Sequence, residues 1–281
     1  MVNPWLGMGM VLGVFGMLMA GLQAYRRSSP KDPEVVRKLL HLGMGLVTLS
    51  FPWVFTSAWP VLLLAGLFAI GLAAVRISRP MHRLLGGVIG EVHRQSLGEI
   101  YFPLAVGLVF YLSRGDPADF CTPMLSLTLA DTGAALIGTR YGRLRFPSGR
   151  EWKSLEGSFT FLAISILGTL VSLLLLTHTG RAETVLIALV LGLLLTLLEA
   201  TAGQGLDNLC IPLGGFLLLR SYRVLDAASL TGRLGVAILL VALFLVTRTP
   251  RPSPGSTRQS APLLVRGCSL GPRRELRHDS L

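Results

Sequence analysis

Long apolar runs with few or no charged residues restrict the fold of this chain more than any other feature. Residues 5–24 form a run of 20 residues without one charged side chain, which is the length that a helix needs to cross a hydrocarbon core of about 30 Å. Eight further apolar runs follow, at 39–55, 58–75, 100–112, 120–139, 157–177, 184–202, 209–219 and 235–247. The pattern predicts an all-α fold, a polytopic bundle of about seven to nine transmembrane helices.

Two of these runs are too short for a full perpendicular span. Residues 100–112 and 209–219 could form tilted, broken or re-entrant helices, and such segments line polar sites in membrane proteins. At the amino terminus, a cleavable signal peptide over 5–24 is disfavoured, because a basic segment does not precede the run and Arg26 and Arg27 follow it.

The distribution of basic residues predicts the topology. Only 15% of the residues are charged, against about 25% in soluble domains, yet the net charge is +11. If all nine runs cross the membrane, 21 of the 26 Lys and Arg residues fall on one side. That side is expected to be cytoplasmic and the amino terminus to lie outside. Topology therefore accounts for the basic surplus, and a nucleic-acid partner is not expected.

The composition changes after the last run. Residues 1–248 are expected to form one membrane domain, whereas residues 249–281 are rich in Pro, Ser and Arg and resemble a disordered, basic cytoplasmic tail. The three cysteines, at 121, 210 and 268, are too far apart for a CxxC pair and indicate neither zinc nor disulfides. No pattern in the sequence predicts an oligomeric state.

Asp131 lies well inside the fifth run, where charge is expensive. An unpaired carboxylate at that depth costs at least about 2.5–3.5 kcal/mol, and intramembrane acids usually have a function. The structural alternative is a protonated Asp131 that hydrogen-bonds to another helix. Gly133, Gly138 and Gly142 follow and allow either tight helix packing or a broken helix around a polar cavity.

A second polar group is the segment REWKSLEGS, residues 150–158, at the entrance to the next run. Lys153, Ser154, Glu156 and Gly157 are expected on the cytoplasmic side, where a phosphate would meet cations and a helix start. Membrane anchoring explains the basic residues of this segment alone, but it does not explain the acid and the small residues beside them.

Two more groups are expected on the same side. The segment EATAGQGLDNLCIP begins at Glu199 and contains Asp207 and Asn208, whose oxygens are of the type that Mg²⁺ prefers, although Asp207 could equally be a helix N-cap. The segment RKLLH contains Arg37, Lys38 and His41, for which membrane anchoring is the alternative. Glu99 adds one more carboxylate at this level.

Acids and bases gathered at one membrane face suit phosphoryl or nucleotidyl transfer, in which a divalent metal and cations neutralise developing charge. The sequence contains neither GxxxxGK[ST] nor the catalytic-loop pattern of protein kinases, so a nucleotide site would be of another design. From the residues alone, an ion-coupled transporter and a catalytically silent membrane scaffold stay open as alternatives.

Four motifs together resemble a known family. RKLLHLGMG, LGEIYFPLAVGL, LADTGAALIGTRYG followed by KSLEGS, and LDNLCIPL occur in this order, as in the polytopic prenol kinases that include phytol, farnesol and dolichol kinases. These enzymes are grouped with the membrane CDP-diacylglycerol synthases. The resemblance covers residues 41–219. It implies transfer of a phosphoryl group from CTP, with Mg²⁺, to the hydroxyl of a membrane isoprenoid alcohol, giving the monophosphate.

The resemblance also implies roles for individual residues. Asp131, Asp207 and Asn208 would hold Mg²⁺, and His41 or Glu199 would accept the proton of the alcohol. The expected nucleotide-binding residues are Arg37, Lys38, Lys153, Ser154 and Gly157, in a loop ordered by Glu156. Ala130 replaces the glycine that commonly precedes the family's Asp. The alternative enzyme is a phosphatidate cytidylyltransferase, which releases pyrophosphate and a CDP-lipid.

Overall fold

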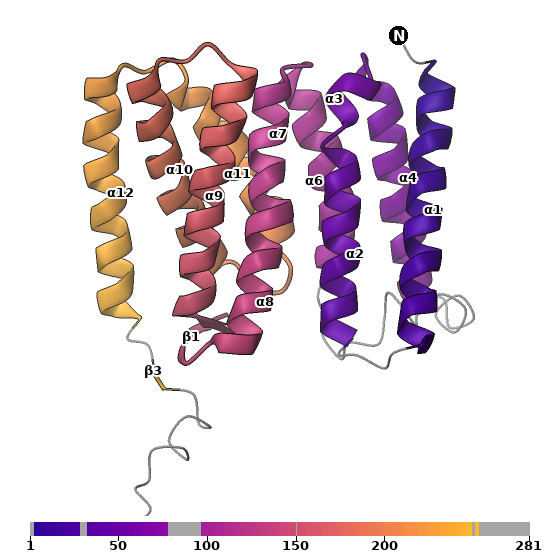
Figure 1. The fold of residues 1–281 in the computed structure, drawn as a ribbon, viewed down its shortest axis with the longest axis horizontal. Helices are drawn as coiled ribbons and strands as arrows, with labels where there is room; N and C mark the ends of the chain where they lie inside the picture. Colours follow the sequence, from indigo (N-terminus) through magenta and orange to yellow (C-terminus); the bar gives the residue numbers. More distant parts are fainter. Residues whose placement is uncertain (1–2, 29–32, 78–96, 150, 249–250, 253–281) are drawn as a thin grey trace, which may run out of the picture.

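The structure is a computed structural model that describes residues 3–28, 33–77, 97–149, 151–248 and 251–252. Most of the described chain forms long helices packed side by side (Figure 1). They are α1 (Pro4–Ser28), α2 (Pro33–Thr48), α3 (Phe51–Val54), α4 (Ala58–Ile77), α6 (Gly98–Ser113), α7 (Pro117–Leu125), η1 (Ser126–Asp131), α8 (Thr132–Tyr141), α9 (Leu155–Leu176), α10 (Arg181–Thr201), α11 (Asp207–Tyr222) and α12 (Ala227–Thr247). The polytopic all-α fold predicted from the sequence is confirmed.

Each of the nine apolar runs lies mostly in helix. Five helical segments are long and apolar enough to cross a membrane by length and composition, and Ala58–Ala74 and Gly98–Ser113 are shorter apolar helices. The run 39–55 is divided between α2 and the short α3. Proline lies in the first turn of α3, where its missing N–H costs nothing, so Pro52 begins a new helix rather than continuing α2.

Different elements lie at the two ends of the bundle. The start of α1 and the short α3 lie at one end, whereas the start of α2, the end of α8 and the end of α12 lie at the other (Figure 1). If the chain crosses the membrane nine times, α1 must begin at one end of the bundle and α12 must finish at the other, and this is the arrangement in the structure. The end with the start of α2 is called the hairpin end below, because it carries a β-hairpin. The tail predicted for 249–281 lies outside the described residues, apart from Arg251–Pro252.

The hairpin was not predicted from the sequence. Strands β1 (Leu144–Ser148) and β2 (Glu151–Ser154) pair antiparallel, with Arg145 opposite Ser154 and Ser148 opposite Glu151. The two-residue β3 (Arg251–Pro252) pairs with the other edge of β1. The connection between β1 and β2 includes Gly149, whose φ of +58° is a left-handed conformation that glycine adopts without strain. This hairpin carries Lys153 and Ser154 back to the helices.

The helix that carries Asp131 changes its geometry within its length. Segments α7, η1 and α8 follow one another without a break, and η1 is a π-helix that ends at Asp131. A π segment places one extra residue in a turn and so changes which faces the next side chains point to; such segments occur frequently at functional sites. Asp131 and its neighbours are therefore presented in a way that a regular α-helix would not produce.

Close contact between α8 and α9 depends on glycine. A Cβ atom on Gly157 would lie 2.8 Å from the backbone oxygen of Ala134, and one on Gly142 would lie 2.7 Å from the Cβ of Ser154. Because neither position has space for a side chain, the start of α9 packs directly on α8. Of the two outcomes considered for the glycines after Asp131, the structure shows tight helix packing, and the helix continues through Asp131 without a break.

Candidate active site

The carboxylate of Asp131 is buried and paired. Lys38 on α2 donates from Nζ to Oδ2 of Asp131 at 2.7 Å, and only 11% and 7% of the two side chains are exposed. The two residues are 93 positions apart in the chain. The pair offsets a charge that would be costly alone inside a membrane. Lys38, which was predicted to bind a nucleotide phosphate, therefore contacts Asp131, which was predicted to bind the metal.

His41 lies beside this ion pair, one turn further along α2. Its Nε2 is 4.0 Å from Oδ2 of Asp131, which is too long for a hydrogen bond. The imidazole packs edge to face against Phe102 of α6, with ring centroids 4.8 Å apart. This contact fixes the ring next to the carboxylate, in a position that sequence spacing did not predict.

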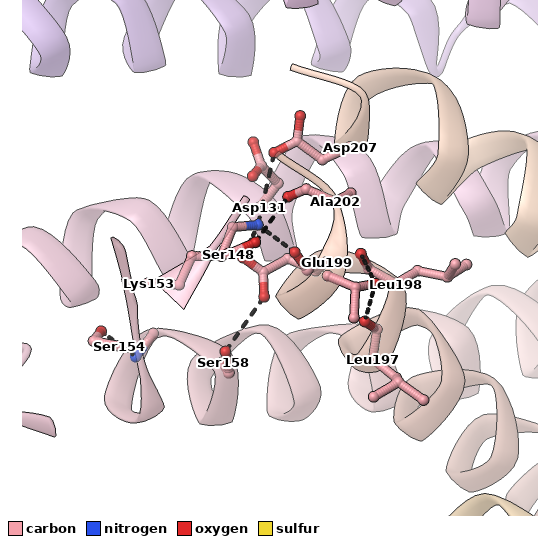
Figure 2. Close-up of polar contacts among 12 residues, drawn as sticks. Asp131, Ser148, Lys153, Ser154, Ser158, Leu197, Leu198, Glu199, Ala202 and Asp207 are labelled. Atoms are coloured by element: carbon pink, nitrogen blue, oxygen red, sulfur yellow. Dashed lines mark hydrogen bonds and ion pairs between the residues drawn. The ribbon is translucent and has the colours of Figure 1, made fainter. Parts of the chain in front are cut away.

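A second ionic group surrounds Lys153 of β2 (Figure 2). The Nζ atom of Lys153 lies 2.8 Å from Oε1 of Glu199 and 3.9 Å from Oδ2 of Asp207. It also donates to the backbone oxygen of Glu199. Burial by itself would lower the pKa of Lys153, but the carboxylates of Glu199 and Asp207 outweigh burial and raise it. Lys153 is therefore a fixed cation that joins β2, α10 and α11.

The start of α9 completes this side of the site. Ser154 is the N-cap of α9, and its Oγ accepts a hydrogen bond from the N–H of Gly157 at 3.1 Å. Ser158, one turn into the helix, donates to Oε2 of Glu199 at 3.3 Å. Both carboxylate oxygens of Glu199 are thus engaged, one by an ammonium group and one by a hydroxyl.

Glu156 contacts the point where the chain enters the hairpin. Its Oε1 accepts hydrogen bonds from the backbone N–H of Arg143 at 2.9 Å and of Leu144 at 3.2 Å. These two residues join α8 to β1, so Glu156 fixes the point at which the chain leaves the helix and enters the hairpin. The placement agrees with a role in ordering the loop rather than in contacting a phosphate.

Asn208 and the turn before α11 hold α11 in place. Nδ2 of Asn208 donates to the backbone oxygen of Gly98 at 2.8 Å, which ties α11 to α6. The turn into α11 contains Gln204 and Gly205 at φ values of +60° and +84°. The hydroxyl of Ser148 donates to the backbone oxygen of Ala202 in this turn at 3.5 Å. Asn208 is therefore at least a structural residue.

Two other residues of the predicted set lie at the edge of the site. Glu99 is in the first turn of α6, and the charges of Arg37 and Arg76 act on its carboxylate. Arg37 precedes Lys38 on α2 and is half-buried. The structure thus brings α2, the start of α6, η1, the hairpin, α10 and α11 to one place, although the six elements are spread over most of the chain.

Sequence reasoning missed two buried hydroxyls close to Asp131. Thr128 and Thr132 are 0% and 3% exposed, and their Oγ1 atoms have no hydrogen-bond partner within the described part of the chain. Threonine in an apolar run carries no signal by itself, because its hydroxyl normally bonds to the carbonyl one turn earlier. Only the structure shows that the hydroxyls of Thr128 and Thr132 do not make this hydrogen bond.

The site has one carboxylate more than it has ammonium groups, and the described residues form no metal cage in advance. The three carboxylates of Asp131, Glu199 and Asp207 meet the two ammonium groups of Lys38 and Lys153. Among the described residues, no group of three or more His, Cys, Asp or Glu side chains is arranged to hold a metal ion. The donor set still fits Mg²⁺, which usually takes one or two protein carboxylates and completes its shell with water and substrate phosphates.

A separate ionic group lies at the opposite end of the bundle. Arg223, directly after α11, contacts Asp116 at 2.8 Å and Asp119 at 2.6 Å. Asp116 is also the N-cap of α7. This group joins α7 to α11 and is too far along the helices to take part in the site around Asp131.

Comparison with known proteins identifies the family. The chain is 32% identical over 219 residues to a phytol kinase of Synechocystis sp., an alignment that covers 76% of this chain and 90% of the relative. No protein-family model matches the chain, and no solved structure matches it. The alignment extends over nearly the whole relative. The chain belongs to the phytol and polyprenol kinase family of multi-pass membrane proteins.

Proposed function

We propose that this protein transfers the terminal phosphoryl group of CTP, with the help of Mg²⁺, to the hydroxyl of a membrane isoprenoid alcohol. The observation that carries the proposal is the convergence of Lys38, Asp131, Lys153, Glu199 and Asp207 at the hairpin end of the bundle. The name of the relative, phytol kinase, supports the alcohol as acceptor. CTP follows from the family resemblance, and the positive-inside pattern supports a cytoplasmic site.

Phosphoryl transfer needs cations around the phosphates and little covalent chemistry from the protein. Lys153 and Lys38 supply fixed positive charge, and the backbone N–H groups at the start of α9 point toward the hairpin end. Arg37 adds a third cation at the same level. Glu156 and Ser154 keep the hairpin and the start of α9 in register, and so they hold Lys153 in position.

Asp131 and Asp207 are the residues that would hold Mg²⁺, with Asn208 beside them. When bound, Mg²⁺ would supply positive charge next to the phosphate oxygens. In the structure, Lys38 contacts Asp131, and Lys153 lies between Glu199 and Asp207. The two lysines therefore hold the acids in place for a cation that would arrive with the nucleotide.

The acceptor step can be written in terms of atoms. The alcohol oxygen attacks the γ-phosphorus, the bond from phosphorus to the bridging oxygen breaks, and the nucleoside diphosphate leaves with the electron pair. The alcohol proton passes to the protein. Of the two candidate bases, His41 is better placed than Glu199, because both oxygens of Glu199 are already engaged whereas Nε2 of His41 has no partner among the described residues.

One assay tests this function. Purified protein is incubated with Mg²⁺, each of the four nucleoside triphosphates, and a panel of phytol, geranylgeraniol, farnesol, a longer polyprenol and phosphatidate, and the products are identified by mass spectrometry. A prenyl monophosphate with CDP is the expected result. A CDP-lipid with pyrophosphate would show the cytidylyltransferase instead. Flux of a solute into proteoliposomes without nucleotide, and no product in any reaction, would favour a transporter.

The variant D131N tests the site. It should lower turnover at least about 100-fold, the scale for loss of one electrostatic group at a transferring phosphoryl, while the protein still accumulates in membranes. D226N is the matched control, because Asp226 is the fully exposed N-cap of α12 and Asn caps as well as Asp. Full activity in D131N would overturn the role of Asp131.

A further inference from the structure

The site has a second level, one helical turn deeper in the bundle than the ion pairs. Four buried side-chain atoms of the described residues have no hydrogen-bond partner: Nε2 of His41 and Oγ1 of Thr128, Thr132 and Thr169. A buried polar atom without a partner costs about 1–3 kcal/mol, so a group of them suggests a ligand or water. Two of the four, His41 and Thr128, are placed by the packing of α2 on η1.

The orientation of Thr128 follows from a glycine on the facing helix. A Cβ atom on Gly45 of α2 would run into the side chain of Thr128. Thr128 therefore points at α2. Gly45 lies four residues after His41, on the same face of α2 and one turn deeper. Lys38, His41 and Gly45 thus follow one face of α2 past Asp131 and Thr128 on η1.

His41 offers an acceptor for one hydroxyl. Its Nε2 has no hydrogen-bond partner among the described residues and lies 4.0 Å from Oδ2 of Asp131, so a hydroxyl bound to Nε2 would lie close to the carboxylate. When the ring proton is on Nδ1, the unpartnered Nε2 of His41 is an acceptor for an O–H group.

The deeper level differs in charge from the ionic one. His41 and Thr128 offer neutral groups, and Phe102 packs on the imidazole. The cations that could bind a phosphate, Lys38 and Lys153, lie one turn nearer the hairpin end. A ligand with a neutral hydroxyl and an apolar chain fits the deeper level, because its chain would extend toward the bilayer core and not toward the hairpin.

We propose that His41 and Thr128 form the subsite that binds the hydroxyl of the lipid alcohol, with the alcohol O–H donating to Nε2 of His41 and the alcohol oxygen accepting from Oγ1 of Thr128. Thr128 is a positioning residue that selects a neutral hydroxyl. This inference rests on the proposed kinase function and adds to it the place where the acceptor binds.

The experiment compares two threonines that are equally buried but lie in different parts of the bundle. Thr128 and Thr169 are both 0% exposed, and neither hydroxyl has a partner in the described structure. Thr169 lies on α9, eleven residues after Ser158, or about 16 Å along the helix axis. T128V should raise the KM for the alcohol about five- to tenfold, the loss expected for one hydrogen bond. T169V should leave that KM unchanged, and neither variant should change the KM for the nucleotide.

The wild-type protein is assayed first, with the alcohol that it phosphorylates in the panel above. If no alcohol is phosphorylated, the proposed function itself fails. If the wild type is active and T128V and T169V have the same KM for the alcohol, the subsite is wrong while the kinase stands. A lower thermal stability of T128V with an unchanged KM would likewise overturn the subsite, because it would assign the hydroxyl to a structural water.

Two further arms keep the test decisive. T128S retains the hydroxyl and should retain a wild-type KM, and T128A replaces T128V if the latter does not accumulate in membranes. Phytene, which has the chain of phytol without its hydroxyl, should inhibit wild type and T128V equally. A weaker inhibition of T128V by phytene would show that Thr128 contacts the chain and not the hydroxyl, and would overturn the proposal.

Discussion

The ion pair between Lys153 and Glu199 allows a quantitative test of the site. With Nζ and Oε1 2.8 Å apart, the Coulomb attraction is about 6 kcal/mol at an effective dielectric constant of about 20, before desolvation is subtracted. The side chains are 12% and 7% exposed, so solvent screens the pair little. K153M leaves the carboxylates of Glu199 and Asp207 without an ammonium group and should cost about 3–5 kcal/mol of folding stability.

The reverse change is expected to be milder. E199Q keeps the shape of the side chain, and Lys153 retains Asp207 and the backbone oxygen of Glu199 as partners. The double variant K153M/E199Q should therefore lose at least about 2 kcal/mol less than the sum of the single variants. The exposed residue Arg140 provides a control, R140M, whose stability should stay within about 0.5 kcal/mol of wild type.

Thermal unfolding of the detergent-solubilised protein measures these differences. A loss of 3–5 kcal/mol corresponds to a fall in Tm of about 6–20 °C for a chain of this size. The pKa of Lys153 is raised above its ordinary value, so the stability it provides is complete below about pH 10 and is lost only as the pH rises through the raised pKa. Lys153 should then stay charged in the folded protein from pH 6 to pH 9. Additive single variants, with a coupling below about 0.5 kcal/mol, would refute the pairing.

Two further predictions concern packing and the opposite end of the bundle. G142A should push the hairpin away from α8, because its Cβ would lie 2.7 Å from the Cβ of Ser154, and it should raise the KM for the nucleotide several-fold, whereas G235A, in open space on α12, should not. R223M should lower Tm without changing either KM, since Arg223 holds α7 to α11. Burial alone would raise the pKa of Asp116, but Arg223 outweighs burial and lowers it. The stability that Asp116 provides is thus lost as the pH falls below about 4, and the fall in Tm between pH 5 and pH 3 should be shallower in R223M than in wild type.

The helices could be predicted because membrane spans are a property of local composition. A run such as 157–177 is apolar over the length of a span whatever it packs against, and the structure places it in α9. The same reasoning assigned Asp131, Lys153, Glu199 and Asp207 to one face, because loop alternation fixes the level of each residue in the bundle. What the sequence predicts well is therefore the position of a residue along the membrane normal.

Lateral neighbours could not be predicted in this way. Lys38 was expected to bind phosphate and Asp131 to bind metal, yet they contact each other across 93 residues. Which helix faces which depends on packing, and the π-helical turn at 126–131 shifts the faces once more. The strands β1 and β2 were also missed, because five and four residues are too few for alternation to be distinguished from a polar loop.

The antiparallel packing of α2 on η1 explains why the site has two levels. As α2 leaves the hairpin end, Lys38 meets Asp131 first, and Gly45 meets Thr128 deeper in the bundle. Charge becomes more costly with depth, so the ionic groups lie at the first level and the neutral His41 and Thr128 beyond it. If the donor binds at the first level and the alcohol at the second, substitutions at Lys153 and Thr128 should act on different substrates. K153M should raise the KM for the nucleotide and T128V the KM for the alcohol; a single variant that raised both equally would show that the levels are not separate sites.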